Sequence, residues 1–401
     1  MLALIIAAAK FGGEILGRLG QPPVLGELLI GVVLGNLGLA GITALQPLGD
    51  STMVRVVSEV GAILLLFEVG VESDLVQLLA VGWSSLIVAT LGVIVPMVLG
   101  YSVSAWFLPD SSWLTHLFVG GTLTATSVGI TARVLKDLGK SGTREASIIL
   151  GAAVADDVIG LVVLAVVSGL VTAATGQSSG SVSVPTILLI VGKAAIFLVA
   201  AVLIGRFFAQ RMFHYAARLK VAGALLAVCI CFCMIVAALA GLVGLAPIVG
   251  AFAAGVVLEE VHYQPFRDRG ERKVEELLQP ITTLIVPVFF VMMGFRVDLR
   301  TFASAEVIAF AAAITFVAIV GKQICGLGVL EKGTDRLAIG VGMIPRGEVG
   351  LIFAGLGSTL MLAGRPILSP TSFSALVLMV MLTTFITPPL LKIAFERKRL
   401  T

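Results

Sequence analysis

The chain has 401 residues, of which 58% are hydrophobic and only 13% are charged, and its mean hydropathy is +1.10. A soluble chain carries about 25% charged residues, so the composition excludes an ordinary soluble protein and predicts an all-α polytopic membrane protein. The formal net charge of +3 is too small to indicate a nucleic-acid partner.

Apolar runs of about 20 residues, the length that crosses a hydrocarbon core of about 30 Å, alternate with short charged stretches. No stretch between them is long enough for a second domain, so we expect residues 1–401 to form a single transmembrane unit. The predicted thirteen transmembrane helices cover residues 1–19, 23–40, 53–71, 83–107, 113–135, 145–171, 184–208, 221–240, 244–260, 278–295, 302–330, 335–363 and 370–395.

Lysine and arginine residues are distributed unequally between the two sets of loops that these helices define. One set, which includes both the 206–220 and 267–273 stretches and the C-terminal Arg397-Lys398-Arg399, contains nineteen of them. The other set contains four, which are Arg55, Arg296, Arg300 and Arg365. Because positively charged loops stay in the cytoplasm, we expect a cytoplasmic C-terminus and an outer N-terminus. A bacterial inner membrane is the simplest host.

Two short motifs recur at nearly the same offset. Residues 23–26 (PVLG) resemble residues 247–250 (PIVG), 224 positions later, and residues 128–130 resemble residues 349–351, 221 positions later. The matches join predicted helices that are seven apart, so the two halves have opposite orientations, as in secondary transporters. We therefore predict inverted six-helix repeats and a linker helix, at residues 1–171, 221–395 and 184–208.

Asp156 and Asp157 lie halfway along the predicted helix 145–171. A charge at the centre of a bilayer costs several kcal/mol on lenient scales and usually faces a cavity or a partner. Two adjacent carboxylates cannot both stay ionised cheaply there, so the pair is suited to hold a proton or a monovalent cation. A static pair of buried acids held by salt bridges is the less favoured alternative, because burying two acids together stabilises little.

Two of the predicted helices contain residues that weaken a helix in mid-membrane. Residues 122–129 are rich in Thr, Ser and Gly, and residues 342–350 contain Gly342, Pro345 and Gly347. Paired interruptions at matching positions of two repeats indicate a transport site, where the Thr126 and Ser127 oxygens could bind a hard cation. The alternative for the first segment is an unbroken helix whose hydroxyls bond to its own carbonyls.

Further charges lie inside predicted helices and need partners or a path to water. Lys322 is isolated in 302–330, and its natural counter-ion is Asp156; the alternative is snorkelling towards the cytoplasmic end. Arg346 and Glu348 could pair with each other near the second break, as structural or gating charges. Glu27, Glu68 and Glu72 are more typical of interfacial positions than of an ion funnel.

Cys229, Cys231 and Cys233 lie in one apolar segment and point to different sides of a helix. We interpret them, together with Cys325, as buried apolar thiols rather than as a metal cluster.

These residues resemble the monovalent cation/proton antiporter superfamily, in its NapA-like and Kef-like branch. The resemblance rests on residues 124–135 (TATSVGITARVL), Ala155-Asp156-Asp157, Lys322 and residues 345–351 (PRGEVGL), with weaker matches at 21–27 and 65–72. Glu68 departs from it, because the family pattern has an apolar residue there.

The resemblance implies a homodimer in which each protomer has thirteen helices, arranged as a core domain and a dimerisation domain. The fifth and twelfth helices of each protomer would be broken and would cross. It implies that Asp157 is the main carrier of Na⁺ and H⁺, that Asp156 pairs with Lys322 and releases it when the ion binds, and that Thr126 and Ser127 lie at the unwound segment. Elevator-like, electrogenic exchange is the implied mechanism, with no cofactor and no enzymatic activity.

The function predicted from the sequence is therefore Na⁺/H⁺ antiport, with the cation at Asp156 and Asp157. K⁺/H⁺ antiport on the same scaffold is the alternative, since both ions take oxygen ligands. A cation channel is a different class and would couple no proton flux to the cation. A symporter of organic anions is disfavoured because the two carboxylates would repel an anion.

Overall fold

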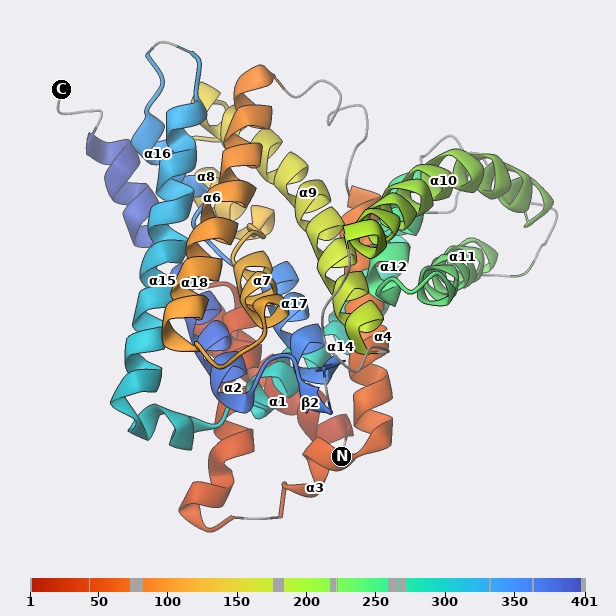
Figure 1. Cartoon of the computed structure of the whole chain (residues 1–401). Coiled ribbons are helices and arrows are strands. Elements are labelled where there is room, and N and C mark those ends of the chain that lie inside the picture. Colours follow the sequence, from red (N-terminus) through yellow and green to blue (C-terminus); the bar gives the residue numbers. More distant parts are fainter. Residues whose placement is uncertain are drawn as a thin grey trace.

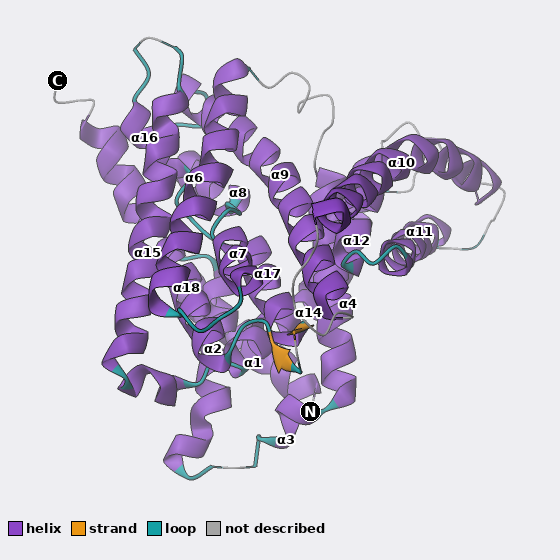
Figure 2. Ribbon diagram, in the orientation of Figure 1, coloured by secondary structure: helices purple, strands orange, loops and turns teal. Residues whose placement is uncertain are grey.

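The computed structural model describes residues 2–42, 44–72, 82–175, 184–216, 221, 223–258, 266, 272–331, 333–362 and 364–397. These residues are almost entirely helical (Figure 2). The α-helices are α1 (Leu2–Arg18), α2 (Pro23–Asn36), α3 (Pro47–Asp50), α4 (Thr52–Glu72), α6 (Trp83–Phe107), α7 (Trp113–Thr122), α8 (Val128–Asp137), α9 (Arg144–Thr175), α10 (Val184–Ala216), α11 (Ala224–Leu242), α12 (Pro247–Val257), α14 (Val274–Phe295), α15 (Ala305–Cys325), α16 (Arg336–Gly342), α17 (Glu348–Thr359) and α18 (Pro370–Arg397). Short 3₁₀ helices cover Leu37–Ala40, Leu299–Ala303 and Gly326–Gly328.

Eight helical stretches in the described part of the chain are long and apolar enough to cross a membrane, and they belong to α2, α6, α9, α10, α11, α14, α15 and α18. The shorter helices α12 and α17 are also apolar. The chain is therefore an integral membrane protein with several apolar helices. Several of the loop cations counted from the sequence, among them Arg218, Arg267 and Lys398, lie outside the described residues.

Some helix ends differ from the predicted ones by several residues. The helix predicted at 335–363 ends at Thr359, because Met361–Leu362 (β1) and Arg365–Pro366 (β2) form a two-stranded antiparallel hairpin. The helix predicted at 184–208 continues to Ala216, since residues 209–216 contain no helix breaker.

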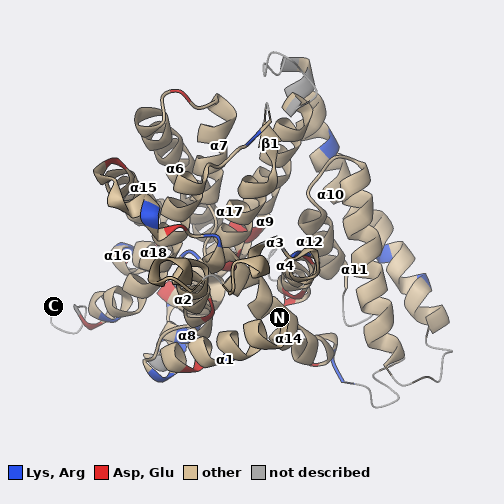
Figure 3. Ribbon diagram, turned by 90° about the horizontal axis from the view of Figure 1, so that it is seen from below, with Lys and Arg blue, Asp and Glu red and all other residues tan. Residues whose placement is uncertain are grey.

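The helices pack in two groups, with α10 and α11 on one side of the molecule, where they pack mainly against α12 (Figure 1). The first group, called here the α4 group, contains α1, α2, α4, α12 and α14. The second, called here the α9 group, contains α6, α7, α8, α9, α15, α16, α17 and α18. Few charged positions lie along the long helices when the bundle is seen from below (Figure 3).

Glycines let the helices of the α4 group approach to backbone contact, as small residues do in membrane helix pairs. A Cβ on Gly26 of α2 would collide with the backbone of Gly12 in α1, and one on Gly31 would collide with Val291 in α14. In α12, Gly250 faces the backbone of Val236 in α11 and Gly255 faces that of Phe67 in α4. The recurring motifs at residues 23–26 and 247–250 thus make similar contacts, because each begins with a proline at the start of a helix and places glycine one turn later.

Candidate functional site

The first interrupted helix breaks between α7 and α8. Helix α7 ends at Thr122 and α8 begins at Val128, so residues 123–127 are non-helical although they are buried. The Thr122 hydroxyl donates to the Phe118 carbonyl at 2.9 Å, and the Thr124 hydroxyl donates to the Gly121 carbonyl at 2.8 Å. These threonines bond back to their own helix, as the unbroken-helix alternative supposed, but the helix ends here, so that alternative is wrong.

The second interrupted helix breaks between α16 and α17, over residues 343–347. Asp335 caps the start of α16 by accepting from the Leu337 and Ala338 amides. The segment that follows α16 contains Pro345, which lacks a backbone N–H donor, and Gly347. Loop backbone therefore lies inside the bundle beside α8 and α17 (Figure 2). Non-helical backbone at this depth is tolerated only where protein or a cavity surrounds it.

The two breaks contact each other. The Ser127 amide donates to the Pro345 carbonyl at 2.8 Å, and the Thr131 hydroxyl of α8 donates to the Gly342 carbonyl at 2.6 Å. The Arg346 guanidinium donates to the Ala125 carbonyl at 2.9 Å. Backbone groups that each broken helix cannot satisfy are thus satisfied by the other.

Asp156 and Asp157 lie near the middle of α9, which packs against α6, α7 and α8. Lys322 reaches Asp156 from α15, and its Nζ donates to Asp156 Oδ1 at 2.8 Å. Both side chains are fully buried, so Lys322 does not snorkel. Gly92 of α6 makes room for the pair, because a Cβ there would lie 3.1 Å from Nζ.

Some carboxylate oxygens of the pair remain without a hydrogen-bond donor from the described residues. They are Asp157 Oδ1 and Asp156 Oδ2, both buried. Asp157 is 7% exposed while Asp156 is fully buried, so Asp157 is the one with an opening to its surroundings. Buried polar atoms are nearly always satisfied, and a carboxylate oxygen in this position is suited to bind a proton or a cation.

The other predicted site residues lie at the crossing of the breaks. The Thr126 hydroxyl lies 3.4 Å from the Met343 carbonyl, and the Ser127 hydroxyl donates to Glu348 Oε2 at 3.2 Å. Glu348 is also close enough to interact electrostatically with Asp157. The expected pairing of Arg346 with Glu348 does not form between these two described residues, because each has turned to the opposite break.

The Arg346 side chain is fully buried, and among the described residues its guanidinium donates only to backbone carbonyls. Besides the Ala125 carbonyl, its guanidinium donates to the Ala318 carbonyl of α15 at 3.3 Å. Its own carbonyl accepts from the Thr384 hydroxyl of α18. Thr384 could not be singled out from the sequence, because it is one of several threonines in a long apolar helix.

A cavity of about 400 Å³ lies between α1, α2, α4, α14 and the start of α17. Its charged lining is formed by Lys10, Glu27, Glu68 and Glu348, and Glu68 accepts a hydrogen bond from Thr282 at 3.1 Å. Glu27 and Glu68 were predicted to lie at membrane interfaces, but Glu27 is buried and both line this cavity. The positions of Glu27 and Glu68 in the sequence could not show that they line a cavity, because the cavity forms between helices from both halves of the chain.

The cysteines divide differently from the prediction. Cys229, Cys233 and Cys325 are buried and Cys231 is exposed, because residues 229 and 233 share one face of α11 and residue 231 lies on the opposite face. No group of three or more His, Cys, Asp and Glu residues in the described part of the chain could hold a metal ion.

Broken helices that cross beside a buried acid pair and a buried lysine define a membrane protein of the secondary transporter class. The sequence matches the family described as "Sodium/hydrogen exchanger, transmembrane" over residues 2–397, and the chain belongs to that family.

Among similar proteins, the high-affinity Na⁺/H⁺ antiporter NhaS3 of Synechocystis is 38% identical, with 98% of this chain and 89% of that protein covered. The Na⁺/H⁺-K⁺ antiporter GerN of Bacillus cereus is 36% identical, with 99% and 96% covered. The solved structure of the sodium proton antiporter MjNhaP1 from Methanocaldococcus jannaschii superposes with a TM-score of 0.70 at 16% identity, over 97% of this chain and 94% of that one, and shares the fold.

Proposed function

We propose that this protein exchanges Na⁺ for H⁺ across a membrane as a secondary active antiporter. One observation carries the proposal: the buried Lys322–Asp156 ion pair lies beside Asp157, whose Oδ1 accepts no hydrogen bond from the described residues. A site with two acids and one lysine has one negative charge too many for an apolar interior, and either a proton or a monovalent cation removes it. Competition for one site is the physical basis of exchange.

Within this proposal Asp157 carries the ion and the proton in turn. Asp156 shares the cation when it binds and releases Lys322, so the pair acts as a switch and the exchange is electrogenic. Thr126 and Ser127 supply further oxygen ligands, while Arg346 and Glu348 hold the two breaks in register. The hydrogen bonds of these residues at the crossing support that division of roles. No resident cofactor is required.

The finer architecture also belongs to the proposal: thirteen transmembrane helices, in inverted repeats at residues 1–171 and 221–395 joined by the linker helix at 184–208. The packing supports it. Helix α2 contacts α1 and α14, and α12, seven predicted crossings later, contacts α11 and α4. Residues 221 positions apart meet at the crossing, as Ala125 meets Arg346 and Ser127 meets Glu348. A pseudo-two-fold axis that relates the two repeats would pass through contacts of this kind, in which a residue meets its counterpart in the other repeat.

The division into two helix groups supports alternating access. We propose that the α9 group is the transport core, that the α4 group belongs to the dimerisation domain of a homodimer surrounded by lipid, and that the core moves against it like an elevator. The ion pair and both breaks belong to the α9 group, so the site would move as one body. The acidic cavity lies at the boundary between the groups, where an entrance would be needed.

K⁺/H⁺ exchange is the second candidate, because GerN, 36% identical, is named as an antiporter of Na⁺, H⁺ and K⁺. A cation channel is less favoured, because the Lys322–Asp156 ion pair would have to break each time a cation passes the site. We place the protein in a bacterial inner membrane with the C-terminus in the cytoplasm, on the distribution of loop lysines and arginines.

The experiment is reconstitution of the full chain into liposomes that contain a pH-sensitive dye and carry a preset pH gradient. Addition of Na⁺ should dissipate the gradient in a saturable manner, and parallel additions of K⁺ and Li⁺ measure selectivity. If none of the three cations moves protons, the antiporter proposal fails. If Na⁺ crosses without proton movement, the channel reading replaces it.

A further inference from the structure

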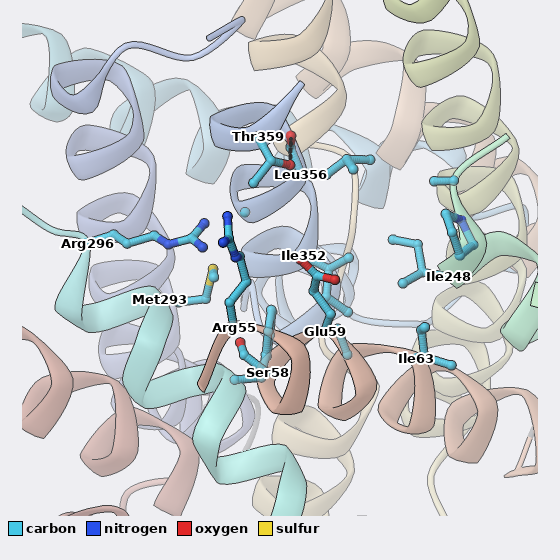
Figure 4. Close-up of a pocket in the computed structure, with 15 residues that line it drawn as sticks. Arg55, Ser58, Glu59, Ile63, Ile248, Met293, Arg296, Ile352, Leu356 and Thr359 are labelled. Atoms are coloured by element: carbon cyan, nitrogen blue, oxygen red, sulfur yellow. Dashed lines mark hydrogen bonds between the residues drawn. The ribbon is translucent and has the colours of Figure 1, made fainter. Parts of the chain in front are cut away.

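A second cavity, of about 220 Å³, lies between α4, α12, α14 and α17 and is separate from the acidic one. It contains the side chains of Arg55 and Glu59 from the first turns of α4 and of Arg296 from the end of α14. Figure 4 shows the guanidinium groups of Arg55 and Arg296 pointing towards one another in this cavity, with the Glu59 carboxylate further along the same wall. The two arginines belong to the set of only four loop cations on the predicted outer side.

The arginines are not neutralised by the described residues. Neither forms an ion pair with them, and Arg296 donates one hydrogen bond, to Ser358 Oγ at 3.1 Å. Glu59 interacts favourably with Arg296 and Arg55 interacts unfavourably with it, so two arginines and one glutamate leave one positive charge in excess. Each guanidinium has five N–H donors in a planar fork that matches the oxygens of phosphate and carboxylate groups. The cavity therefore has donors and positive charge in excess of its acceptors.

The remaining wall is largely apolar, while the Arg55 and Glu59 side chains are exposed and Arg296 is half-buried. Met293 of α14, Ile248 of α12 and Ile352 of α17 form part of it. Charge-assisted bonds between a guanidinium and an oxyanion are roughly twice as strong as hydrogen bonds between neutral groups. The volume lies below the 300–1,000 Å³ typical of pockets for drug-sized ligands, so the occupant is a small group.

We propose that this cavity binds a phosphate-type oxyanion between Arg55 and Arg296, either as a free anion or as the headgroup of a phospholipid. This site is distinct from the cation site and goes beyond the proposed exchange function. Because Arg296 also bonds to Ser358 in α17, the anion would be held where the α4 group meets the helix that begins at the second break.

The test uses the purified full chain, stripped of lipid in a neutral detergent. Its thermal unfolding is followed while sodium phosphate replaces sodium chloride at constant Na⁺ concentration and ionic strength, since a ligand of the native state raises the unfolding temperature. We expect a saturable rise for the wild type. Removing one charged donor should weaken the apparent affinity about tenfold or more, so Arg55→Gln and Arg296→Gln should both require higher phosphate.

Arg300→Gln is the matched control, because Arg300 is exposed on the neighbouring 3₁₀ helix and does not line the cavity. A second arm counts phosphatidylglycerol molecules retained by each variant in native mass spectrometry. Loss of phosphate binding in both cavity variants assigns a free anion, and loss of bound lipid without a phosphate response assigns a headgroup. The proposal is overturned if neither probe distinguishes Arg55→Gln from the wild type, or if Arg300→Gln has the same effect. Because both arms measure binding, their failure would leave the exchange proposal intact.

Discussion

The two broken helices meet at one crossing but are built from different side chains. The break between α7 and α8 supplies carbonyls and hydroxyls, whereas the break between α16 and α17 supplies the Arg346 guanidinium and the Glu348 carboxylate. The guanidinium of the second break bonds to the backbone of the first, and the hydroxyl of Ser127 bonds to the carboxylate of the second. Neither break could satisfy its own polar groups alone, so the crossing depends on the difference between them.

Arg346 in the second break and Lys322 in the neighbouring ion pair are both buried cations, but they have different partners. Lys322 has a carboxylate partner, while Arg346 has only carbonyls from the described residues. A lysine that can lose its one partner is suited to switching. An arginine with several fixed carbonyl partners is suited to holding two segments together. The substitutions below separate these two uses of buried charge.

The largest loss of stability is expected for Lys322→Ala. It leaves Asp156 buried without its counter-ion, and breaking a buried pair in this way costs about 3–5 kcal/mol. The free energy of unfolding in detergent, measured by denaturant titration, should fall by that amount. The double variant Lys322→Ala with Asp156→Asn removes both charges and should recover most of the loss. If the single and double variants are equally stable, Lys322 and Asp156 are not energetically coupled.

Arg346→Gln should have the next largest effect. The variant loses the charge-assisted bonds to the Ala125 and Ala318 carbonyls, and such bonds contribute about 1.5–3 kcal/mol each. We expect the free energy of unfolding to fall by about 3 kcal/mol, whereas Arg300→Gln, an exposed arginine, should change it little. A stable Arg346→Gln variant would mean that the crossing is held by packing rather than by the guanidinium.

Ser127→Ala removes one neutral donor from Glu348 and should cost about 1 kcal/mol of stability. Its effect on transport should be larger than its effect on stability, because the proposal makes the hydroxyl oxygen a cation ligand. The apparent KM for Na⁺ should therefore rise while the maximal exchange rate changes less. An unchanged KM would assign Ser127 a purely structural role at the crossing.

Thr126→Val should have the smallest effect on stability. The bond of the Thr126 hydroxyl to the Met343 carbonyl is long, at 3.4 Å, and valine preserves the shape of the side chain. We expect a change below about 0.5 kcal/mol, given the steep weakening of hydrogen bonds with poor geometry. A rise in the KM for Na⁺ without loss of stability would identify Thr126 as a ligand. No change in either would remove it from the site.

Much of the site follows from local sequence, since an acid pair in an apolar run and two runs weakened by Gly, Pro and hydroxyl residues are visible without a structure. Lys322 could be identified because it is an isolated cation in an apolar helix. The partners of Arg346 could not, because backbone carbonyls from residues 125 and 318 carry no sequence signal. The two cavities were missed for a related reason: Glu27, Glu68, Arg55 and Arg296 acquire their surroundings only when helices distant in sequence pack together.

The central claim is that Asp157 carries the ion and the proton. It is tested most directly by Na⁺-driven proton movement in proteoliposomes that contain Asp157→Asn, with Asp110→Asn, an exposed acid in the loop before α7, as the control. Asparagine keeps the shape of the side chain but cannot exchange a proton, so the account predicts that Asp157→Asn abolishes Na⁺-dependent proton flux while Asp110→Asn behaves as the wild type. Full exchange by correctly inserted Asp157→Asn would contradict it.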